Sequence, residues 1–454
     1  MRKLFSLVVI VTLLFGLAIT DVSAIPTRDR QAVIDELNAY GIGVLDHYPS
    51  REPTTADDYY KLGIAYLFRN MSQAAAEQFR KALELDPGHV DSLIGLAVST
   101  ARLGDMEEAL KHSSKAIQIQ PNSAKVHNAV GSLRLANATS PNHLNEAEAR
   151  FKKAISLDSR FVPPRMNLAR LYISMGKPEA AIEECKAVIA IQPENLAAHA
   201  ELARAYLNTG SLDEATKESE KTVELSPQNP ISHNILGEMY ARKGQLDKAL
   251  AEFQKAVGVE PTYAPGYKNI GHVYLLTSLP DKAIEEYRKA LSYRPNYGEV
   301  YSGLGDAYLI KGMTQKAAEE YKNAVRVLPV SALVSVPAYN NLAYIYAEES
   351  QELDEALSLA QRAIQLAPKH PGIADTLGWV YYKKGLYDEA VANLEVASKG
   401  MPDNPTVRYH LGAAYCKQGA KDKAAAELKK ALNMNDEFEG VEDAKRLLAE
   451  LEGG

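Results

Sequence analysis

The stretch that decides the fold runs from Tyr267 to Pro295 and reads YKNIGHVYLLTSLPDKAIEEYRKALSYRP. Apolar or small residues recur three or four positions apart in each half of it: Tyr267, Ile270, Gly271 and Tyr274, then Ala283, Tyr287 and Ala290. This spacing is that of one apolar face of an α-helix, so two short helices joined by a turn are predicted. Neither helix can bury its face alone, and the unit therefore requires similar neighbours on both sides.

The rest of the chain supplies those neighbours. We number the unit so that Tyr267 is position 4 and Pro295 is position 32. Position 32 is proline in nine units, most of them 34 residues apart, and position 20 is alanine in all eleven units that align. Position 8 is always glycine or alanine, which lets paired helices approach closely. Glycine at position 15, as in Gly104, suits the left-handed residue that ends a helix.

This signature resembles the tetratricopeptide repeat, in which an aromatic residue, Leu-Gly, Tyr, Ala, Phe and Pro recur over 34 residues. The resemblance implies an all-α fold, a right-handed α-α superhelical solenoid of stacked helix-turn-helix repeats. We expect eleven tandem repeats over residues 56–438, an N-terminal cap segment over 25–55 and a C-terminal capping helix over 439–454. Insertions near 137–146 and 330–337 are either tolerated changes of loop length or interaction loops. Of the two insertions, the apolar one near 330–337 is the stronger candidate for an interaction loop.

The first 24 residues have the pattern of a secretory signal peptide. Arg2 and Lys3 precede an apolar run over residues 4–19, and a cleavage site of small residues ends at Ala24. The alternative is an uncleaved membrane anchor. We therefore expect an exported protein in the periplasm or cell envelope of a bacterium. The net charge of −7 and the pI of about 5.9 argue against nucleic acid as a partner.

The sequence contains no Gly-x-Gly-x-x-Gly, no phosphate-binding loop, no His-Glu-x-x-His and no Cys-x-x-Cys. We predict no enzyme activity, no cofactor, no metal and no small-molecule substrate. His127, His199 and His233 occupy position 4, where the family places a packed aromatic residue, and are expected to fill that slot. Cys185 and Cys416 lie seven repeats apart, too far for a disulfide. We expect Cys185 to be a buried thiol, whereas Cys416, on the inner face, could be reactive.

The resemblance also implies a concave groove, lined by the first helices at positions 2, 5, 9, 12 and 13. The packing signature leaves these positions free, and they vary along the chain. The candidate groove residues are Tyr60, Ile64, Phe68, Arg170, Arg204, Lys268, His272, Tyr344, Trp379, Tyr382 and Tyr409. Trp379 is the only tryptophan and, with Tyr382, a candidate hot spot. The alternative is that Trp379 packs against the neighbouring repeat.

The resulting hypothesis is a non-enzymatic scaffold. It would bind an extended peptide or protein in the groove, for assembly or secretion of an envelope complex, a pilus or an exopolysaccharide, and would meet a membrane only through an uncleaved anchor or a partner. The alternative is a polysaccharide-binding accessory protein, whose tyrosines would stack on sugar rings. Chaperone-binding members clamp a C-terminal carboxylate with Lys at position 5 and Asn at position 9. That clamp is absent, because Lys268 is the only lysine at position 5 and His272 stands at its position 9.

Overall fold

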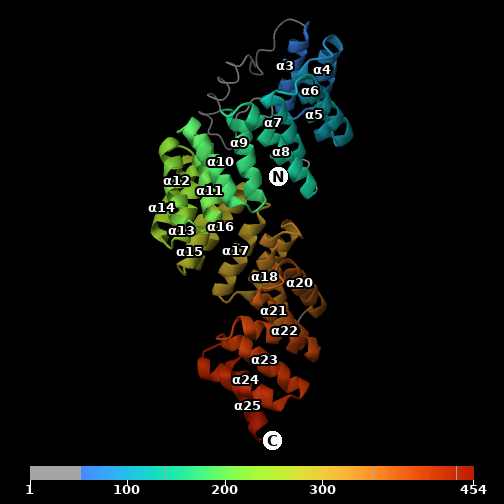
Figure 1. Ribbon diagram of the computed structural model, residues 1–454. Coiled ribbons are helices and arrows are strands. Elements are labelled where there is room, and N and C mark those ends of the chain that lie inside the picture. Colours follow the sequence, from blue (N-terminus) through green and yellow to red (C-terminus); the bar gives the residue numbers. More distant parts are fainter. Residues whose placement is uncertain (1–52, 137, 139, 351, 436, 454) are drawn as a thin grey trace. The chain divides into compact units, whose positions relative to one another are not determined.

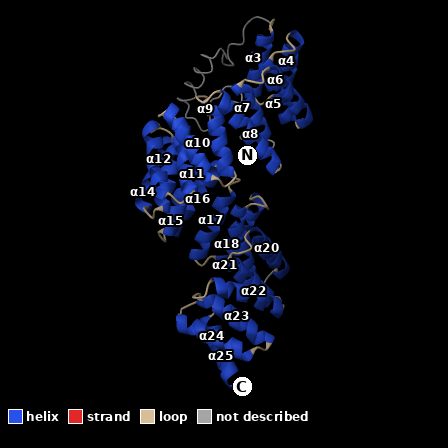
Figure 2. Cartoon of the chain, viewed as in Figure 1, coloured by secondary structure: helices blue, strands red, loops and turns tan. Residues whose placement is uncertain are grey.

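The chain is described by a computed structural model that covers residues 53–453, apart from 137, 139, 351 and 436. The described residues form 23 α-helices and one short 3₁₀ helix, and none of them is in a strand (Figures 1 and 2). The predicted all-α solenoid of helix pairs is confirmed. None of the helices in this part of the chain is long and apolar enough to cross a membrane. The predicted signal peptide and most of the N-terminal cap segment lie outside the described residues.

The chain divides into two compact units, residues 1–261 and 262–454. Among its described residues, the first unit contains six helix pairs, each made of a first and a second helix. Their bounds are α3 (Ala56–Phe68), α4 (Ser72–Leu85), α5 (Val90–Leu103), α6 (Met106–Ile119), α7 (Ala124–Ala136), α8 (Pro141–Leu157), α9 (Val162–Ser174), α10 (Pro178–Ile191), α11 (Leu196–Asn208), α12 (Leu212–Leu225), α13 (Pro230–Arg242) and α14 (Leu246–Val259). Each pair packs on the next through its second helix, as α4 packs on α5.

The second unit contains five helix pairs and a final helix among its described residues. They are α15 (Ala264–Leu276), α16 (Pro280–Tyr293), α17 (Gly298–Ile310), α18 (Thr314–Val327), α19 (Val336–Glu348), α20 (Leu353–Leu366), α21 (Pro371–Lys383), α22 (Tyr387–Gly400), α23 (Pro405–Gln418), α24 (Lys421–Met434) and α25 (Val441–Gly453). The 3₁₀ helix η2 (Leu333–Ser335) precedes α19. Helix α25 packs on α24 and α23 and buries Ala444 (Figure 1).

In the repeats with glycine at position 8, the core centres on one large side chain at position 24 that rests on this glycine. In α15 and α16, a Cβ built on Gly271 would lie 2.6 Å from Cε1 of Tyr287, far inside van der Waals contact. The same ring approaches Gly303 of the next first helix, where a Cβ would lie 2.6 Å from Cζ. Tyr287 is therefore held between the backbones of two successive first helices, and it is almost fully buried.

The connections between repeats are closed by a polar side chain at position 4, which donates a hydrogen bond to the carbonyl six residues earlier. We call this contact a latch. Histidine, arginine and tyrosine all form it, and the six pairs are His127 with Pro121, Arg165 with Ser159, His199 with Pro193, His233 with Pro227, Tyr301 with Pro295 and Arg408 with Pro402. The latch gives a hydrogen-bond partner to a carbonyl of the turn, two residues after the preceding helix ends.

The two predicted insertions take different forms. In the third repeat, the second helix α8 is lengthened to 17 residues. In the ninth repeat, the chain between α18 and α19 forms η2, and Val330, Leu333 and Val334 stay exposed. The hydroxyl of Ser335 donates to the carbonyl of Pro329 at 2.6 Å, so it takes the part of the latch in this longer connection.

Candidate functional site

The second unit carries a cavity of about 370 Å³ on the side formed by its first helices. Its lining comes mainly from the first helices α17, α19, α21 and α23, and consists of Leu309, Asn340, Asn341, Tyr344, Gly372, Asp375, Thr376, Met401, Asn404, Thr406 and Val407. Six of these eleven residues stand at the predicted groove positions 2, 5, 9 or 12, so the cavity lies on the predicted face. Six of the eleven lining residues carry an amide or a hydroxyl group, whereas the residues selected from the sequence were mostly aromatic or charged.

Two polar atoms at position 5 of neighbouring repeats lack partners. The Nδ2 of Asn340 donates to Oδ1 of Asn341 at 3.3 Å, but its own Oδ1 is buried without a hydrogen bond. The hydroxyl oxygen of Ser302, one repeat earlier, is also buried and unpartnered. An unpaired buried acceptor costs about 1–3 kcal/mol, so a ligand donor that reached it would relieve this cost. The shared position could have identified both residues from the sequence.

A buried polar network supports the cavity wall behind Asn341. Tyr321 donates its hydroxyl proton to Oδ1 of Asp306 at 2.5 Å, and Nδ2 of Asn341 donates to the same oxygen at 3.3 Å. Burial raises the pKa of Asp306 above its usual value, although both hydrogen bonds act in the opposite direction. Burial and the neighbouring Asp306 also raise the pKa of Tyr321. These contacts hold the amide of Asn341 in one orientation at the edge of the cavity.

The aromatic candidates of the last repeats are packed together and are not free rings. Trp379 is 3% exposed, stacks on Tyr382 at a centroid distance of 4.6 Å and on His410 at 3.9 Å, and donates its indole N–H to Glu348. Tyr409 is also buried. The expectation of an accessible Trp379 is therefore wrong, and the alternative, packing against the neighbouring repeat, describes the structure. Position 9 of one first helix faces position 6 of the next, which hides the indole.

The apolar entrance expected in the first repeat is part of the core. Ile64 is fully buried, and Tyr60 is buried against the rings of Phe79 and His89. Phe68 is half-buried and packs against the same cluster. Ile64 is hidden because α3 also packs against the next first helix α5, whose apolar residues cover position 9. Tyr60 and Ile64 are accordingly withdrawn as ligand contacts.

The charged candidates are engaged in ion pairs. Arg170 and Arg204 share the buried carboxylate of Glu201, at 2.8 Å from Nε of Arg170 and 3.2 Å from Nη1 of Arg204. Nη2 of Arg170 is buried and unpartnered, while most of the Arg204 side chain is exposed. In the second unit, Lys268 pairs with Glu299 at 2.9 Å. Burial, followed by the charge of Lys268, lowers the pKa of His272.

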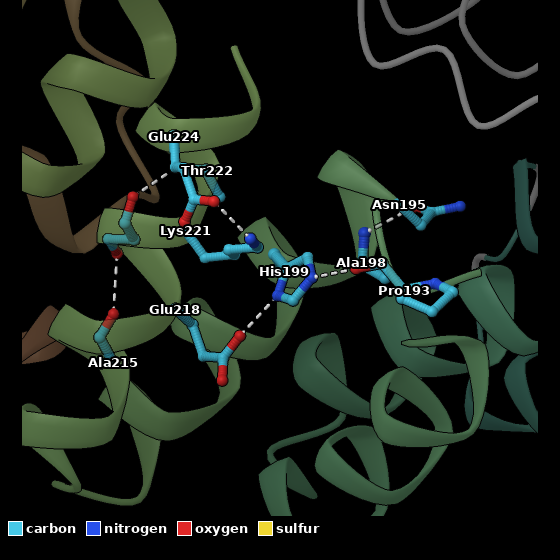
Figure 3. A network of polar contacts seen from close by, with 10 residues as sticks. Pro193, Asn195, Ala198, His199, Ala215, Glu218, Lys221, Thr222 and Glu224 are labelled. Atoms are coloured by element: carbon cyan, nitrogen blue, oxygen red, sulfur yellow. Dashed lines mark hydrogen bonds and ion pairs between the residues drawn. The ribbon is translucent and has the colours of Figure 1, made fainter. Parts of the chain in front are cut away.

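The three histidines at position 4 are buried and act as latches. His199 donates from Nε2 to the carbonyl of Pro193 at 2.9 Å, and its Nδ1 lies 2.6 Å from the carboxylate of Glu218 (Figure 3). His233 repeats this arrangement with Pro227 and Glu252. These nitrogens are therefore used in packing between helices. In the part of the chain that the structure describes, no three His, Cys, Asp or Glu side chains are grouped to hold a metal ion.

The two cysteines are free and differ in burial. Cys185 is fully buried, and burial raises the pKa of its thiol to about 12, so the prediction of a buried thiol is confirmed. Cys416 is half-buried, and burial raises its thiol pKa as well. A raised pKa lowers the fraction of the nucleophilic thiolate, which argues against a reactive role for Cys416.

An array of helix pairs with a cavity lined mainly by its first helices defines a helical-repeat protein. The chain belongs to the tetratricopeptide repeat family: family models described as tetratricopeptide or TPR repeats match residues 60–124, 173–239, 237–277, 281–312, 336–370 and 378–419. Together these matches cover more than half of the chain. Repeats of this family form scaffolds for protein–protein interaction and are typically non-catalytic.

Two curated relatives match parts of the chain. The human protein O-mannosyl-transferase TMTC3 is 29% identical over 145 residues, which are 31% of this chain and 15% of that protein. The cellulose synthase 1 operon protein C of Komagataeibacter xylinus is 25% identical over 160 residues, 34% of this chain and 12% of that protein. The chain thus spans less than a sixth of either relative.

Among solved structures, the chain is similar to the APC/C Cut9–Hcn1 hetero-tetramer, at 15% identity and a TM-score of 0.48, over 87% of this chain and 96% of that chain. It is also similar to the MamA protein, at 27% identity and a TM-score of 0.32, over 36% of this chain and 90% of that chain.

Proposed function

We propose that the protein is a non-enzymatic scaffold of a bacterial cell envelope, which holds an extended segment of a partner protein on the inner face of its second unit. The observation that carries the proposal is the cavity, whose lining includes Asn340 with its buried, unpaired Oδ1. An extended peptide presents backbone N–H donors at regular intervals. The unpaired acceptor of Asn340 at the cavity suits such a ligand.

The affinity of this face would come from preorganisation. Helices α19, α21 and α23 hold the cavity wall in place, and Asn341 is fixed by Asp306 and Tyr321. A partner segment would therefore gain contacts while the scaffold loses little conformational entropy. The segment would bear the ordering cost, as coupled folding and binding requires.

The proposed location follows from the N-terminal signal pattern and receives modest support from the K. xylinus relative, which is named for a cellulose synthase operon. The process we propose is assembly or secretion of an envelope complex, a pilus or an exopolysaccharide. The name of that relative also favours the second candidate, a polysaccharide-binding accessory protein. Against it, the rings of Trp379 and Tyr382 are stacked on each other and leave little free surface for sugar.

Capture from the native envelope with two matched variants tests the proposal. Thr406→Arg places a long cation at the cavity, whereas Thr314→Arg places the same group on the second helix α18, where Thr314 is also half-buried near a helix start. The partner's segment, prepared as a synthetic peptide, should bind the wild type and Thr314→Arg equally and Thr406→Arg at least tenfold more weakly. Equal binding to all three proteins would refute the cavity as the site. Binding that survives protease treatment of the extract would favour the polysaccharide reading.

A further inference from the structure

Residues 437–440, which directly precede α25, contact the first helices α19 and α23. We call residues 437–440 the C-terminal strap. Glu439 accepts a hydrogen bond at 2.8 Å from the hydroxyl of Tyr344, which lies 95 residues earlier in α19. Phe438 meets the ring of Tyr409 at a centroid distance of 6.3 Å. The strap therefore joins the end of the array to a first helix two repeats upstream of the last one.

The strap is fitted closely to the surface beneath it. Gly440 has a φ of +90°, and a Cβ added to it would lie 2.2 Å from Cε1 of Tyr409. Both the left-handed backbone and the contact with the ring require glycine at this point. The side chain of Asn435 fixes the entry to the strap, because its Oδ1 accepts from the backbone N–H of Glu437 at 2.9 Å. The strap is thus a defined element and not a loose connection.

The covered surface is the aromatic cluster of the last three first helices. Trp379 and Tyr409 are buried there, and the pKa of Tyr344 is raised by burial and by the charge of Glu439. Tyr344 also lines the neighbouring cavity. One hydroxyl group therefore belongs to both the cavity and the strap contact, so a ligand that takes this hydroxyl would compete with Glu439.

We propose that the strap is an intramolecular stand-in for part of the partner, and that this surface accepts an extended segment in which an aromatic residue is followed by an acidic one. This inference rests on the proposed peptide-binding function and names its ligand more closely. The aromatic residue takes the place of Phe438 beside Tyr409, and the acidic residue takes the place of Glu439 at Tyr344. Because the strap is tethered, its effective concentration is on the order of millimolar, so a free peptide competes poorly until the strap lifts.

The single tryptophan provides the test, since Trp379 is the chain's only one and lies within the covered cluster. In the full chain, Phe438→Ala with Glu439→Gln should raise the acrylamide quenching constant of Trp379 at least threefold. Glu437→Gln, which removes an exposed carboxylate of the same strap, should leave it unchanged. Tyr344→Phe removes only the hydroxyl group that donates to Glu439, and it should raise the quenching constant by a smaller amount. This variant keeps the test valid if the double variant loses helix content.

A peptide of residues 435–441, Asn-Asp-Glu-Phe-Glu-Gly-Val, is the probe. It should bind the double variant at least tenfold more tightly than the wild type and restore the protection of Trp379. A peptide with Ser for Phe and Gln for the following Glu should do neither. Unchanged quenching in both the double variant and Tyr344→Phe, or equal affinity of the peptide for wild type and double variant, would overturn the inference.

These measurements use no cellular partner, so they separate the two proposals. If Trp379 responds to the strap variants and a partner's segment binds Thr406→Arg as tightly as the wild type, the cavity is rejected as the binding site and the aromatic surface is retained. Loss of binding in Thr406→Arg together with an unresponsive Trp379 would retain the cavity and reject the strap as a stand-in.

Discussion

Adding one methyl group at Gly271 should destabilise the seventh repeat, although alanine is the better helix former. The added Cβ would stand 2.6 Å from Cε1 and 2.7 Å from Cδ1 of Tyr287, where ordinary carbon contacts are about 3.5–4 Å. The ring would have to retreat by about 1 Å. It cannot do so freely, because Gly303 brings the backbone of α17 against its other edge.

The expected magnitude is the difference of two effects. Overpacking a filled core costs about 1–3 kcal/mol. The better helix propensity of alanine returns up to about 1 kcal/mol. We expect Gly271→Ala to lower the free energy of local unfolding by about 1–2 kcal/mol. Gly258→Ala is the control, because Gly258 lies in helix α14 with nothing within 4 Å of an added Cβ, and it should stabilise its helix by up to about 1 kcal/mol.

The assay is native-state hydrogen exchange, read separately for the amides of α15–α16 and of α14. A repeat array need not unfold in one step, so a local measurement is preferable to a single melting temperature. Exchange should become faster in α15 and α16 for Gly271→Ala and slower in α14 for Gly258→Ala. If Gly271→Ala slowed exchange as its control does, the clamping of Tyr287 between two backbones would be refuted.

Three further results are expected. Ala283→Leu should overpack the fully buried position 20 and lower stability by about 1–3 kcal/mol, seen as a lower urea midpoint; an unchanged midpoint would show that the repeat register is wrong. The pKa of Glu252 is lowered in the folded state by Lys255 and His233, which outweigh burial, so its contribution is present above its unfolded pKa and lost as pH falls. The stability difference between wild type and Glu252→Gln should therefore shrink between pH 7 and pH 3, and a constant difference would contradict this assignment. A thiol reagent at pH 7 should label Cys416 slowly and Cys185 only on unfolding, so rapid labelling of either would disprove the burial argument.

Much of the repeat architecture could be predicted from spacing alone. Helix α15 begins three residues before Tyr267, and α16 ends two residues before Pro295. The size rule of the core was also present in the sequence but was not used. Position 24 is bulky where position 8 is glycine, as in Gly237 with Phe253, and small where position 8 is alanine, as in the fifth repeat. One position read alone does not reveal this, because the rule concerns the fit between the two residues of the pair.

The candidate site was predicted less well, for a physical reason. Groove positions were taken as free because packing within one helix pair does not need them. Successive first helices also touch each other, however, and this contact buries Ile64 and contributes to the burial of Trp379. The strap escaped notice because Phe438 is the last residue of the eleventh predicted repeat and stands outside the positions at which the apolar pattern recurs. The position of the cavity agrees with the predicted groove positions, but its amide chemistry was not anticipated.

The latch has a consequence for how such an array can be lengthened. Donor and carbonyl are six residues apart at every latch described above, so the contact requires a connection of fixed length. In the ninth repeat four extra residues precede the first helix: Ser335 reaches Pro329 over the usual six, and the hydroxyl of Tyr339 is buried without a partner. Ser335 thus supplies the latch donor in a connection that is four residues longer than the others. The connection between Pro329 and α19 is therefore where a protein engineer should insert foreign sequence. An insertion at this point should cost the array the least stability.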